Sequence, residues 1–447
     1  MSPAAEAIRE RFEAAGVRAL AMTMVDNGGI TRVKVVPIGR LERVAANGVG
    51  MAYIWAAAGT DDLFADVPPF DNPSGDMRLI PDLAAARVLT AAPGWGWAPV
   101  DQMSQELEPV PACQRDALKR VVQAADAAGI ELRATFEIEA TLVDPEGRPA
   151  HTGPGYSTRA LSLIDGFLLD LVDALETSSI EVEQFHPEYA PGQFEVSIAP
   201  RDALGAADDL VFVRTQMRFA ASRHGLEVSF APIVFPGEVG NGCHLHLSVW
   251  RDGRNLLQGG DGAAGTTPAG AAALAGVVTA LPELLAVLAP SPAAYVRLQP
   301  HHWAGAYGCW GVENREAAVR FIPGTITSRE RSANFEVKVG DGGANPYLAV
   351  ALVAGAALDG VERDAALPDP IQDDPASLTA AELERRGIAR LPSTLHQATD
   401  RFEAGALARR VLGDVLHDAF VAVRRREWET HGSLSEDELA AAYRWRY

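Results

Sequence analysis

Four short segments of this 447-residue chain alternate apolar and polar side chains, as β-strands with one buried face do. They are 136-FEIEATL-142, 194-FEVSI-198, 243-CHLHLSVW-250 and 335-FEVKV-339. In each segment the apolar residues share one face, and the opposite face carries most of the acids and histidines. The residues on these polar faces are Glu137, Glu139, Glu195, His244, His246, Ser248, Glu336 and Lys338.

A cluster of carboxylates and imidazoles forms if these four strands are neighbours in one sheet. Carboxylates so close together repel one another, and oxygen ligands with an occasional imidazole suit Mg²⁺ or Mn²⁺. Two such ions can clamp a phosphoryl group during transfer. Arg297, Arg315 and Arg320 add planar donors for carboxylate or phosphate. The pattern indicates phosphoryl transfer from a nucleotide; the alternative, that each polar face simply meets water, fits four such strands poorly.

Other kinds of nucleotide and nucleic-acid site find no support in the sequence. The chain has no Walker A loop, and no GxGxxG motif opens a helix after a strand. Its formal net charge of −20 argues against a phosphate-backbone partner, which needs clustered Lys and Arg. We therefore expect no nucleic-acid partner and a nucleotide site that is not a P-loop.

Cysteine usage and hydropathy predict a cytoplasmic protein with no membrane partner. Cys113, Cys243 and Cys309 are widely spaced, which gives neither a disulfide framework nor a CxxC metal site. Residues 1–16 predict an amphipathic helix of mixed charge, in contrast to the order of a signal peptide. No apolar run reaches the ~18 residues that a membrane span needs.

Turn and helix signals divide the chain into a small and a large domain. Asn27-Gly28-Gly29 lies between two strand-like runs, which predicts a β-hairpin. Strand and turn signals continue from there, and we predict domains at residues 1–105 and 106–447. In the second domain, apolar spacing predicts helices over residues 112–130, 158–178, 203–225, 270–289, 345–362 and 404–430.

Eight motifs, in this order, resemble the glutamine synthetase family over nearly the whole chain. They are DNGGITRVKVVP (26–37), GDMRLIPD (75–82), FEIEA (136–140), HPEYAPGQFE (186–195), NGCHLHLSV (241–249), YVRLQP (295–300), ENREAAVRF (313–321) and FEVKVGDGGANPYLA (335–349). The resemblance implies an α+β fold: a small N-terminal β-grasp domain, and a large catalytic domain with a curved antiparallel sheet and flanking helices. It also implies a homo-oligomeric ring, commonly a dodecamer, with active sites between subunits.

The same resemblance implies a reaction and its site residues. The γ-carboxylate of glutamate attacks ATP, and an amine then displaces the phosphate, with two or more Mg²⁺ or Mn²⁺ ions per site. By motif, one metal site is implied for Glu139, Glu188 and Glu195, and a second for Glu137, His244 and Glu336. The glutamate site is implied for Arg297, Gly240 and Lys338. The ATP side is implied for Glu183, His246, Ser248, Arg315 and Arg320, with Arg315 and Glu195 as catalytic residues.

The chain departs from ammonia-using members of the family at two places. Where those members have a Glu that closes the site and takes a proton from ammonium, this chain has Trp303, and an indole cannot act as a general base. Where they have an Asp that helps bind ammonium, this chain has 50-GMAYIWAAAG-59 without an acid, and Asp61 and Asp62 follow at the wrong offset. The sequence therefore predicts retained phosphorylation and a changed nucleophile, with Trp303 in the reaction site.

Aromatic residues in place of these acids predict a carbon-bearing amine. The candidates for its pocket are Tyr53, Trp55 and Trp303, with Tyr307 and Trp310 as further aromatic residues. An alkylammonium ion gains ~0.5–2 kcal/mol on an aromatic face, and each buried CH₂ adds ~0.8 kcal/mol. We predict a γ-glutamyl-amine ligase for a small monoamine, with ethanolamine as first choice. A polyamine would want a further carboxylate for its distal ammonium, and the acids at hand are Asp61, Asp62 and Glu313.

Three points stay open at this level. The proton of the amine could pass to His301 or His302, both placed in the substrate pocket, or to Glu195. Glutamate is the expected acid, but Lys338 stands where the family usually has Arg and offers a point charge in place of a planar fork. The alternative functions are polyamine γ-glutamylation, ordinary glutamine synthesis, a ligase for a different acid, and a non-catalytic scaffold on the same fold.

Overall fold

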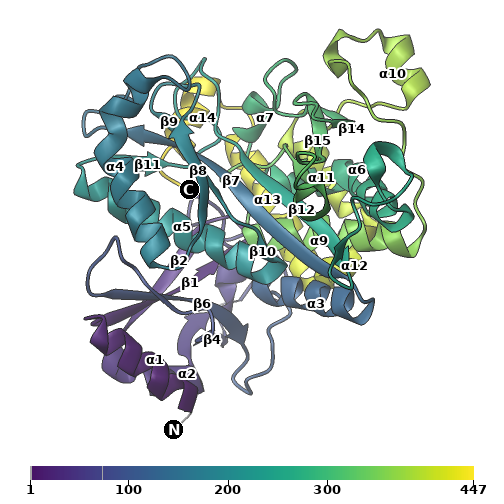
Figure 1. The fold of residues 1–447 in the computed structure, drawn as a ribbon. Coiled ribbons are helices and arrows are strands. Elements are labelled where there is room, and N and C mark those ends of the chain that lie inside the picture. Colours follow the sequence, from purple (N-terminus) through teal and green to yellow (C-terminus); the bar gives the residue numbers. More distant parts are fainter. Residues whose placement is uncertain (1–2, 73) are drawn as a thin grey trace.

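Two sheets organise the chain, and the structure, a computed structural model, describes residues 3–72 and 74–447 (Figure 1). The N-terminal sheet has the strand order β2-β1-β6-β4-β3, with β5 paired to β6. Because β1 runs parallel to β6 and antiparallel to β2, the predicted β-grasp arrangement is confirmed. The strands are β1 (Ala19–Val25), β2 (Thr31–Pro37), β3 (Val49–Ala52), β4 (Asp76–Pro81), β5 (Arg87–Val88) and β6 (Trp95–Met103).

The predicted hairpin joins β1 to β2 and also contacts the larger domain. The strands pair from Val25 opposite Thr31, so the turn lies where the Asn-Gly-Gly signal predicts it. Gly29 has φ +83°, and a Cβ there would lie 2.0 Å from the backbone oxygen of Gly343. Only glycine allows both this left-handed conformation and this close approach. The turn therefore holds the N-terminal sheet against the catalytic part of the chain.

The catalytic sheet has ten strands in the order β14-β15-β16-β12-β7-β9-β8, with β10 and β11 paired to β7 and β13 paired to β12. All pairs are antiparallel except β14 with β15. The four strands predicted from alternation are therefore direct neighbours, in the order β16-β12-β7-β9. Their bounds, with those of the other strands, are β7 (Glu131–Val143), β8 (Val182–Pro187), β9 (Gln193–Ile198), β10 (Arg201–Asp202), β11 (Glu227–Ser229), β12 (Cys243–Arg251), β13 (Arg254–Asn255), β14 (Tyr307–Val312), β15 (Ala317–Ile322) and β16 (Asn334–Val337).

One face of this sheet is part of the main hydrophobic core. Phe136 and Ile138 of β7 and Leu245 and Leu247 of β12 are at most 3% exposed. Helix α5 packs on β7, and α9 packs on β12. With its apolar residues committed to these helices, the sheet presents its acids and histidines on the opposite face.

Most predicted helices are confirmed, but the one over residues 404–430 is wrong. That region forms two helices, Ala406–Leu412 and Asp414–His431, separated at Gly413, whose φ of +79° a continuous α-helix does not allow. The helices are α1 (Pro3–Ala14), α2 (Leu41–Asn47), α3 (Gln114–Ala127), α4 (Thr158–Thr177), α5 (Ala203–Arg223), α6 (Pro268–Leu288), α7 (Ala294–Arg297), α8 (Arg329–Ser332), α9 (Pro346–Glu362), α10 (Ala380–Arg386), α11 (Leu395–Glu403), α12 (Ala406–Leu412), α13 (Asp414–His431) and α14 (Glu436–Tyr443). Short 3₁₀ helices are η1 (Ile38–Arg40), η2 (Tyr53–Ala57), η3 (Ala263–Gly265) and η4 (Pro375–Ser377).

Helix α6 is the one described helix with the length and apolar composition of a membrane span. In this structure 78% of its apolar window is buried, and it packs against α9 and α11. Its burial is that of a core helix.

Candidate active site

The polar face of the catalytic sheet opens into a cavity of about 640 Å³. Strands β7, β8, β9 and β12 form its floor, and Arg297 and the loop that follows it lie at its side. Its volume lies within the ~300–1,000 Å³ typical of small-molecule sites. The predicted site residues that line the cavity are Glu137, Glu139, Glu188, Glu195, Gly240, His244, Arg297, His301, His302, Trp303, Arg315, Arg320 and Lys338.

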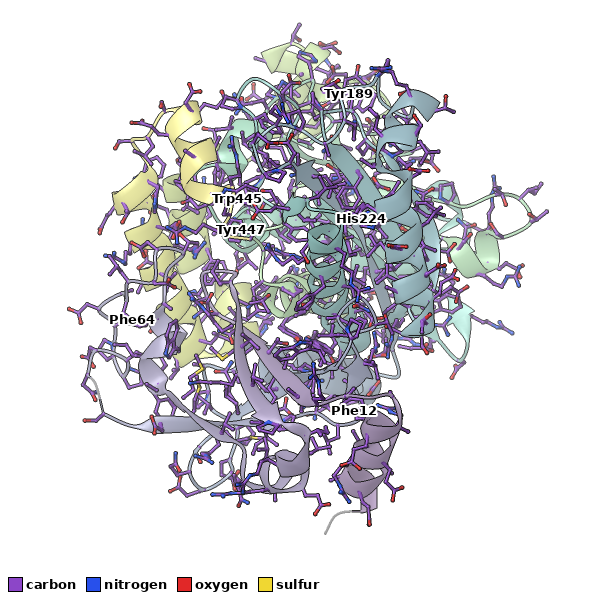
Figure 2. The ribbon with its side chains drawn as sticks, turned by 90° about the vertical axis from the view of Figure 1, so that its left-hand side faces the viewer. Phe12, Phe64, Tyr189, His224, Trp445 and Tyr447 are labelled. Atoms are coloured by element: carbon purple, nitrogen blue, oxygen red, sulfur yellow. The ribbon has the colours of Figure 1, made fainter. Side chains whose placement is uncertain are left out.

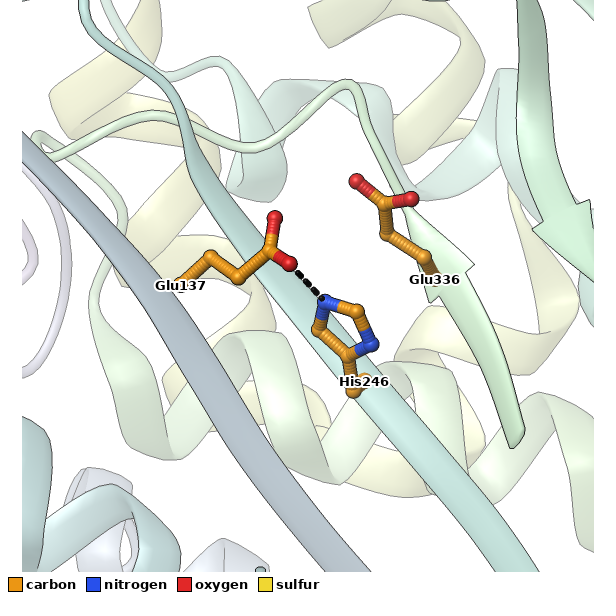
Figure 3. A group of neighbouring side chains, drawn as sticks. All are labelled: Glu137, His246 and Glu336. Carbon is orange, nitrogen blue, oxygen red and sulfur yellow. Dashed lines mark ion pairs between the residues drawn. The ribbon is translucent and has the colours of Figure 1, made fainter. Parts of the chain in front are cut away.

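Strand register brings one group of acids and histidines together on β7, β12 and β16. His244 is directly opposite Glu137, and His246 is directly opposite Glu336. His244 Nδ1 lies 3.1 Å from Glu137 Oε2 and 3.0 Å from Glu336 Oε1, so this predicted trio converges. His246, predicted on the ATP side, joins the same group, and Figure 3 shows its ion pair with Glu137, at 3.4 Å. The atom of this ion pair, Nε2, is buried and makes no hydrogen bond of good geometry among the described residues.

A second group lies on β8, β9 and the turn between them. His186 Nε2 is 3.2 Å from Glu188 Oε1 and 4.0 Å from Glu195 Oε1. Glu139, predicted as a ligand in this group, is the direct cross-strand partner of Glu195 and also lies 3.7 Å from His244 Nε2. The structure therefore brings Glu139, Glu188 and Glu195 to one wall of the cavity and adds His186 to them.

Sequence reasoning missed His186, and also Tyr156. The Tyr156 hydroxyl donates to Glu188 Oε1 at 2.5 Å, and its ring stacks on His186 with centroids 5.0 Å apart. Burial and the Glu188 carboxylate raise the pKa of Tyr156, which keeps the phenol protonated as a donor. The alternation that identified Glu195 also exists at His186 and Glu188, spaced i, i+2, and was the available signal.

The two groups differ in electrostatic balance. Burial opposes charge on Glu336, but Lys338 and His244 outweigh it and hold the pKa of that carboxyl well below its usual range. Burial also opposes charge on His244, but its hydrogen bonds to Glu137 and Glu336 raise its pKa to about 9. By contrast, burial and the nearby Glu137 and Glu139 raise the pKa of Glu195 to about 7. Negative charge is therefore least compensated beside Glu195.

The donor set fits divalent cations. Carboxylate oxygens dominate, the imidazoles of His186, His244 and His246 contribute, and like-charged carboxylates face each other directly on β7 and β9. Hard divalent ions prefer such oxygen-rich sites, and the buried His246 Nε2, which makes no hydrogen bond among the described residues, can add a nitrogen ligand. Two groups of three residues could each hold an ion, because within each group the possible ligand atoms lie within 4.8 Å of one another. The groups are Glu137, His246 and Glu336, and His186, Glu188 and Glu195.

Arg297 is held rigidly at the cavity wall. Its Nε donates to the Asn241 carbonyl at 3.1 Å, and its Nη2 donates to the carbonyls of Lys338 and Gly340 at 3.0 and 2.6 Å. Nη1 remains for a ligand, because no side chain in residues 3–72 or 74–447 accepts from it. Gly240 lies alongside, and a Cβ there would be 2.0 Å from the Pro232 carbonyl oxygen. The arrangement is suited to a carboxylate that approaches the backbone closely.

The other cationic side chains lie around Glu336. Lys338 Nζ donates to Glu336 Oε1 at 3.1 Å, and Arg320 Nη1 donates to Glu336 Oε2 at 3.3 Å. Arg320 also donates to Glu313, and Arg315 is exposed to the cavity from the turn between β14 and β15. These groups can contact an anionic ligand above the carboxylate cluster.

Three residues predicted on the ATP side are not among those that line the cavity: His246, which belongs to the cluster described above, Glu183 and Ser248. A register shift between Val182 and Gln184 on β8 turns Gln184 toward the cavity, and Glu183 is exposed elsewhere. Ser248 is buried on β12 and accepts a hydrogen bond from the Trp250 indole at 2.8 Å. Their contact with a nucleotide stays a prediction.

The segment 299–306, which we name the gate loop, brings His301, His302 and Trp303 to the cavity. His301 and Trp303 have φ of +65° and +52°, and Gly305 has φ +80°. Trp303 is 56% exposed, an unusual position for so large an apolar side chain. With Tyr156 and Tyr189, both 62% exposed, it gives the cavity an aromatic lining.

The other predicted aromatic residues lie elsewhere. Trp310 is completely buried and donates to the Pro368 carbonyl, so its proposed place in the amine pocket is wrong. Tyr307 packs beside a small core cluster and does not line the cavity. Tyr53 and Trp55 belong to η2 of the N-terminal part, where Trp55 packs edge-on against Phe64. Neither Tyr53 nor Trp55 lines the cavity of its own chain, and Figure 2 shows Phe64, which Trp55 contacts, well apart from Tyr189 of the cavity.

Comparison with known proteins agrees with this geometry. Residues 3–113 match the family described as glutamine synthetase N-terminal domain, and residues 111–441 match glutamine synthetase, catalytic domain. The chain is 46% identical to gamma-glutamylpolyamine synthetase GlnA3 of Streptomyces coelicolor over 449 residues, covering 99% of this chain and 96% of that protein.

Two solved structures share the fold over almost the whole chain. A crystal structure of a novel glutamine synthase homolog has a TM-score of 0.87 at 34% identity, covering 96% of this chain and 99% of that one. GmaS in complex with ADP has a TM-score of 0.84 at 30% identity, with 96% and 98% covered. The predicted family and fold are therefore confirmed, and with them the dependence of the family on ATP and a divalent metal. The chain belongs to the glutamine synthetase family and is an ATP-dependent ligase that joins glutamate to an amine.

Proposed function

We propose that this enzyme phosphorylates the γ-carboxylate of glutamate with ATP and couples the acyl group to a carbon-bearing primary amine, with a polyamine as the first candidate. One observation carries the proposal. Trp303 lines the same cavity as Arg297 and five of the six predicted metal ligands, in the place where the family resemblance expects an acid. The phosphorylation machinery and an aromatic amine site thus share one chamber.

The sequence-based preference for ethanolamine is not confirmed. The full-length relative at 46% identity is named for polyamines, which favours the alternative that the sequence left open. A cavity of about 640 Å³ can hold a longer amine, and Tyr189 and Trp303 are both largely exposed in its lining. An alkylammonium chain can lie along such aromatic faces and bury its CH₂ groups, whereas ammonium has no carbon to bury.

Phosphorylation would use the residues of the sheet face. Glu139, Glu188 and Glu195 are proposed to hold one divalent cation, and Glu137, His244 and Glu336 a second, with Mg²⁺ or Mn²⁺ as the fitting ions. His186 and His246 are close enough to take part in these two sites. Bound there, the cations would neutralise phosphate oxygens and orient the phosphoryl group.

The remaining cavity residues would position the two substrates. Arg297 is proposed to bind glutamate through Nη1, with its other nitrogens fastened to carbonyls, and Gly240 lets the carboxylate approach the backbone. Arg315 and Arg320 are proposed to contact phosphate oxygens. Since Trp303 cannot accept the proton of the amine, a neighbouring His301, His302 or Glu195 would do so.

Assembly into a ring with active sites between subunits completes the proposal. Tyr53 and Trp55, remote from the cavity of their own chain, would then approach the cavity of a neighbouring subunit. The exposed Val33 and Val35 on edge strand β2 of the same sheet support a contact there, since apolar side chains on an unpaired edge favour association. We expect this assembly in the cytoplasm, and mass photometry of the purified chain would give its subunit number.

Phosphate release with glutamate, ATP and single amines tests the function. We expect putrescine, spermidine or another carbon-bearing amine to stimulate release at least tenfold over ammonia, with the γ-glutamyl amide as product by mass spectrometry. Highest activity with ethanolamine would restore the monoamine alternative. Activity with ammonia alone would contradict the proposal and identify ordinary glutamine synthesis.

A further inference from the structure

The gate loop is held in an unfavourable backbone conformation by contacts from outside the loop. His301 and Trp303 both occupy the left-handed region, at φ +65° and +52°. That region costs a residue with a side chain roughly 1 kcal/mol or more, so it persists only where surrounding structure imposes it. The contacts that impose it determine where the Trp303 indole lies.

Glu316 makes the contact at Trp303 itself. Its Oε1 accepts the backbone N–H of Trp303 at 3.0 Å, and Glu316 is half-buried beneath the loop. The Glu316 backbone N–H in turn donates to Asn314 Oδ1 at 3.0 Å. Asn314 Nδ2 donates to the carbonyls of Ile371 and Asp373 at 2.7 and 3.0 Å. Glu316 therefore connects the gate loop to a turn that is anchored on a second loop.

Two further contacts join side chains of the gate loop to residues outside it. His301 Nδ1 lies 2.8 Å from Asp374 Oδ2, and Arg390 donates to Gln299 Oε1 at 3.1 Å. Both are made by side chains away from Trp303, whereas the Glu316 bond is made to the backbone of Trp303 itself. All three bonds are exposed, and the Glu316 bond is the one that acts directly on the Trp303 backbone, so it is the most direct restraint on Trp303.

The same turn carries a residue of the proposed phosphate site. Arg315 immediately precedes Glu316 and lines the cavity, and Ala317 begins β15, whose Arg320 also lines it. A change in the turn would therefore reach both the gate and the arginines. Glu316 thus connects Trp303, through its hydrogen bond, to Arg315, its neighbour in the chain.

We infer that Glu316 is a positioning residue for amine selection: its carboxylate sets Trp303 over the acyl-phosphate, so that the amine enters and water is kept out. The inference rests on the proposed function. Without this restraint, water can attack the carbonyl carbon of γ-glutamyl phosphate. That attack forms a C–O bond to water, breaks the bond from carbon to the phosphate oxygen, and yields glutamate, phosphate and a proton. Loss of the Glu316 bond would thus let ATP be consumed without formation of the amide.

The test measures phosphate release with glutamate and ATP, without amine and with a saturating amine, in the assembled enzyme. Glu316→Ala should raise amine-independent release at least fivefold and raise the KM for the amine about tenfold, while the KM for glutamate changes less than twofold. Glu316→Gln keeps an acceptor oxygen and should stay within about twofold of wild type in each quantity. Glu384→Ala, at an exposed glutamate of α10, is the matched control and should change none of them.

A double variant separates a positioning role from general loosening of the fold. If Glu316 acts through Trp303, Glu316→Ala should add no further uncoupling to a Trp303→Ala enzyme. Additive effects in the double variant, wild-type coupling in Glu316→Ala, or the same defect in Glu316→Gln would each overturn the inference. Failure of the proposed function looks different, because no amine would then stimulate phosphate release by the unaltered enzyme.

Discussion

Glu139 on β7 and Glu195 on β9 are direct cross-strand partners, which places two carboxylates opposite each other on the cavity floor. Like charges at this position destabilise a sheet unless something lies between them. Protein donors offset part of this repulsion: Gly242 N–H and Gln193 Nε2 donate to Glu139, and Ser197 Oγ donates to Glu195. The repulsion that these donors leave uncompensated favours a cation bound between the two carboxylates.

Divalent metal should therefore stabilise the fold as well as support catalysis. We expect Mg²⁺ or Mn²⁺ to raise the Tm of the metal-free enzyme, since an ion at one hundredfold its Kd contributes about 2.7 kcal/mol to the free energy of unfolding. Glu195→Gln should reduce the metal-induced shift without lowering the metal-free Tm, because it removes a like charge. Differential scanning fluorimetry with and without EDTA measures both. An unchanged Tm in wild type on adding either metal would refute the cation site.

Glu336 is the carboxylate that offsets the charges of the cationic side chains around it. It is 1% exposed and contacts Lys338, Arg320 and His244. Glu336→Gln leaves buried cations without their partner, which costs about 3–5 kcal/mol in comparable cases. We expect a large drop in the urea midpoint and at least a hundredfold loss of amine-dependent phosphate release. Glu330→Gln, at an exposed glutamate of α8, is the control, and equal behaviour of the two variants would contradict this role.

Gly240 is proposed to matter because it lacks a side chain. An added Cβ would lie 2.0 Å from the Pro232 carbonyl oxygen and 3.2 Å from Arg297 Cδ, so the backbone and Arg297 must shift. Gly240→Ala should raise the KM for glutamate at least tenfold, with a smaller change in the KM for the amine. Gly237→Ala, in the same loop but with open space around it, isolates the steric effect, although its φ of +77° carries its own strain. A glutamate KM that Gly240→Ala leaves unchanged would place glutamate elsewhere.

Asp341 gives a prediction for the pH dependence of stability. It is 1% exposed with Oδ2 unpartnered among the described residues, and burial raises its pKa from 3.8 to about 6 despite Arg297 nearby. Between these values the folded chain holds a proton that the unfolded chain has lost. Its contribution to stability is therefore full below pH 3.8 and is lost as the pH rises through about 6, at a cost of about 3 kcal/mol.

The Asp341→Asn variant removes this dependence and keeps an acceptor for the Gly343 N–H. We expect the Tm of Asp341→Asn minus that of wild type to increase from pH 5 to about pH 7 and then to level off towards pH 8. A difference that is flat over this range, or that decreases, would show that Asp341 does not titrate there.

The sequence predicted the cluster because alternation along a strand reports directly which side chains share a face. The apolar residues of β7 and β12 had to be buried together, and this placed Glu137, His244 and His246 on one side. Strand adjacency itself came from the family resemblance, since alternation does not say which strands pair. The register then explains why His244 is opposite Glu137 and not one residue away.

The misses have local physical causes. On β8 an irregularity between Val182 and Gln184 shifts the alternation, so Gln184 faces the cavity in place of Glu183. On β14 a similar shift between Tyr307 and Trp310 accompanies the burial of Trp310. The apolar spacing over residues 404–430 does not reveal the positive φ of Gly413. At this residue one helix ends and the next begins. Each case depends on tertiary packing that periodicity does not describe.

The measurement that tests the account most directly compares wild type with Trp303→Glu on two amines, ammonia and spermidine. Both enzymes are assayed for γ-glutamyl product with glutamate and ATP at saturation. We predict that wild type prefers spermidine by at least tenfold in kcat/KM, and that Trp303→Glu lowers this preference at least tenfold through loss of spermidine activity. Its phosphorylation of glutamate should persist, because the hydrogen bond of Trp303 in the described chain goes to Glu316 and to none of the predicted metal ligands. An unchanged amine preference in Trp303→Glu would contradict the central claim that this residue selects the amine.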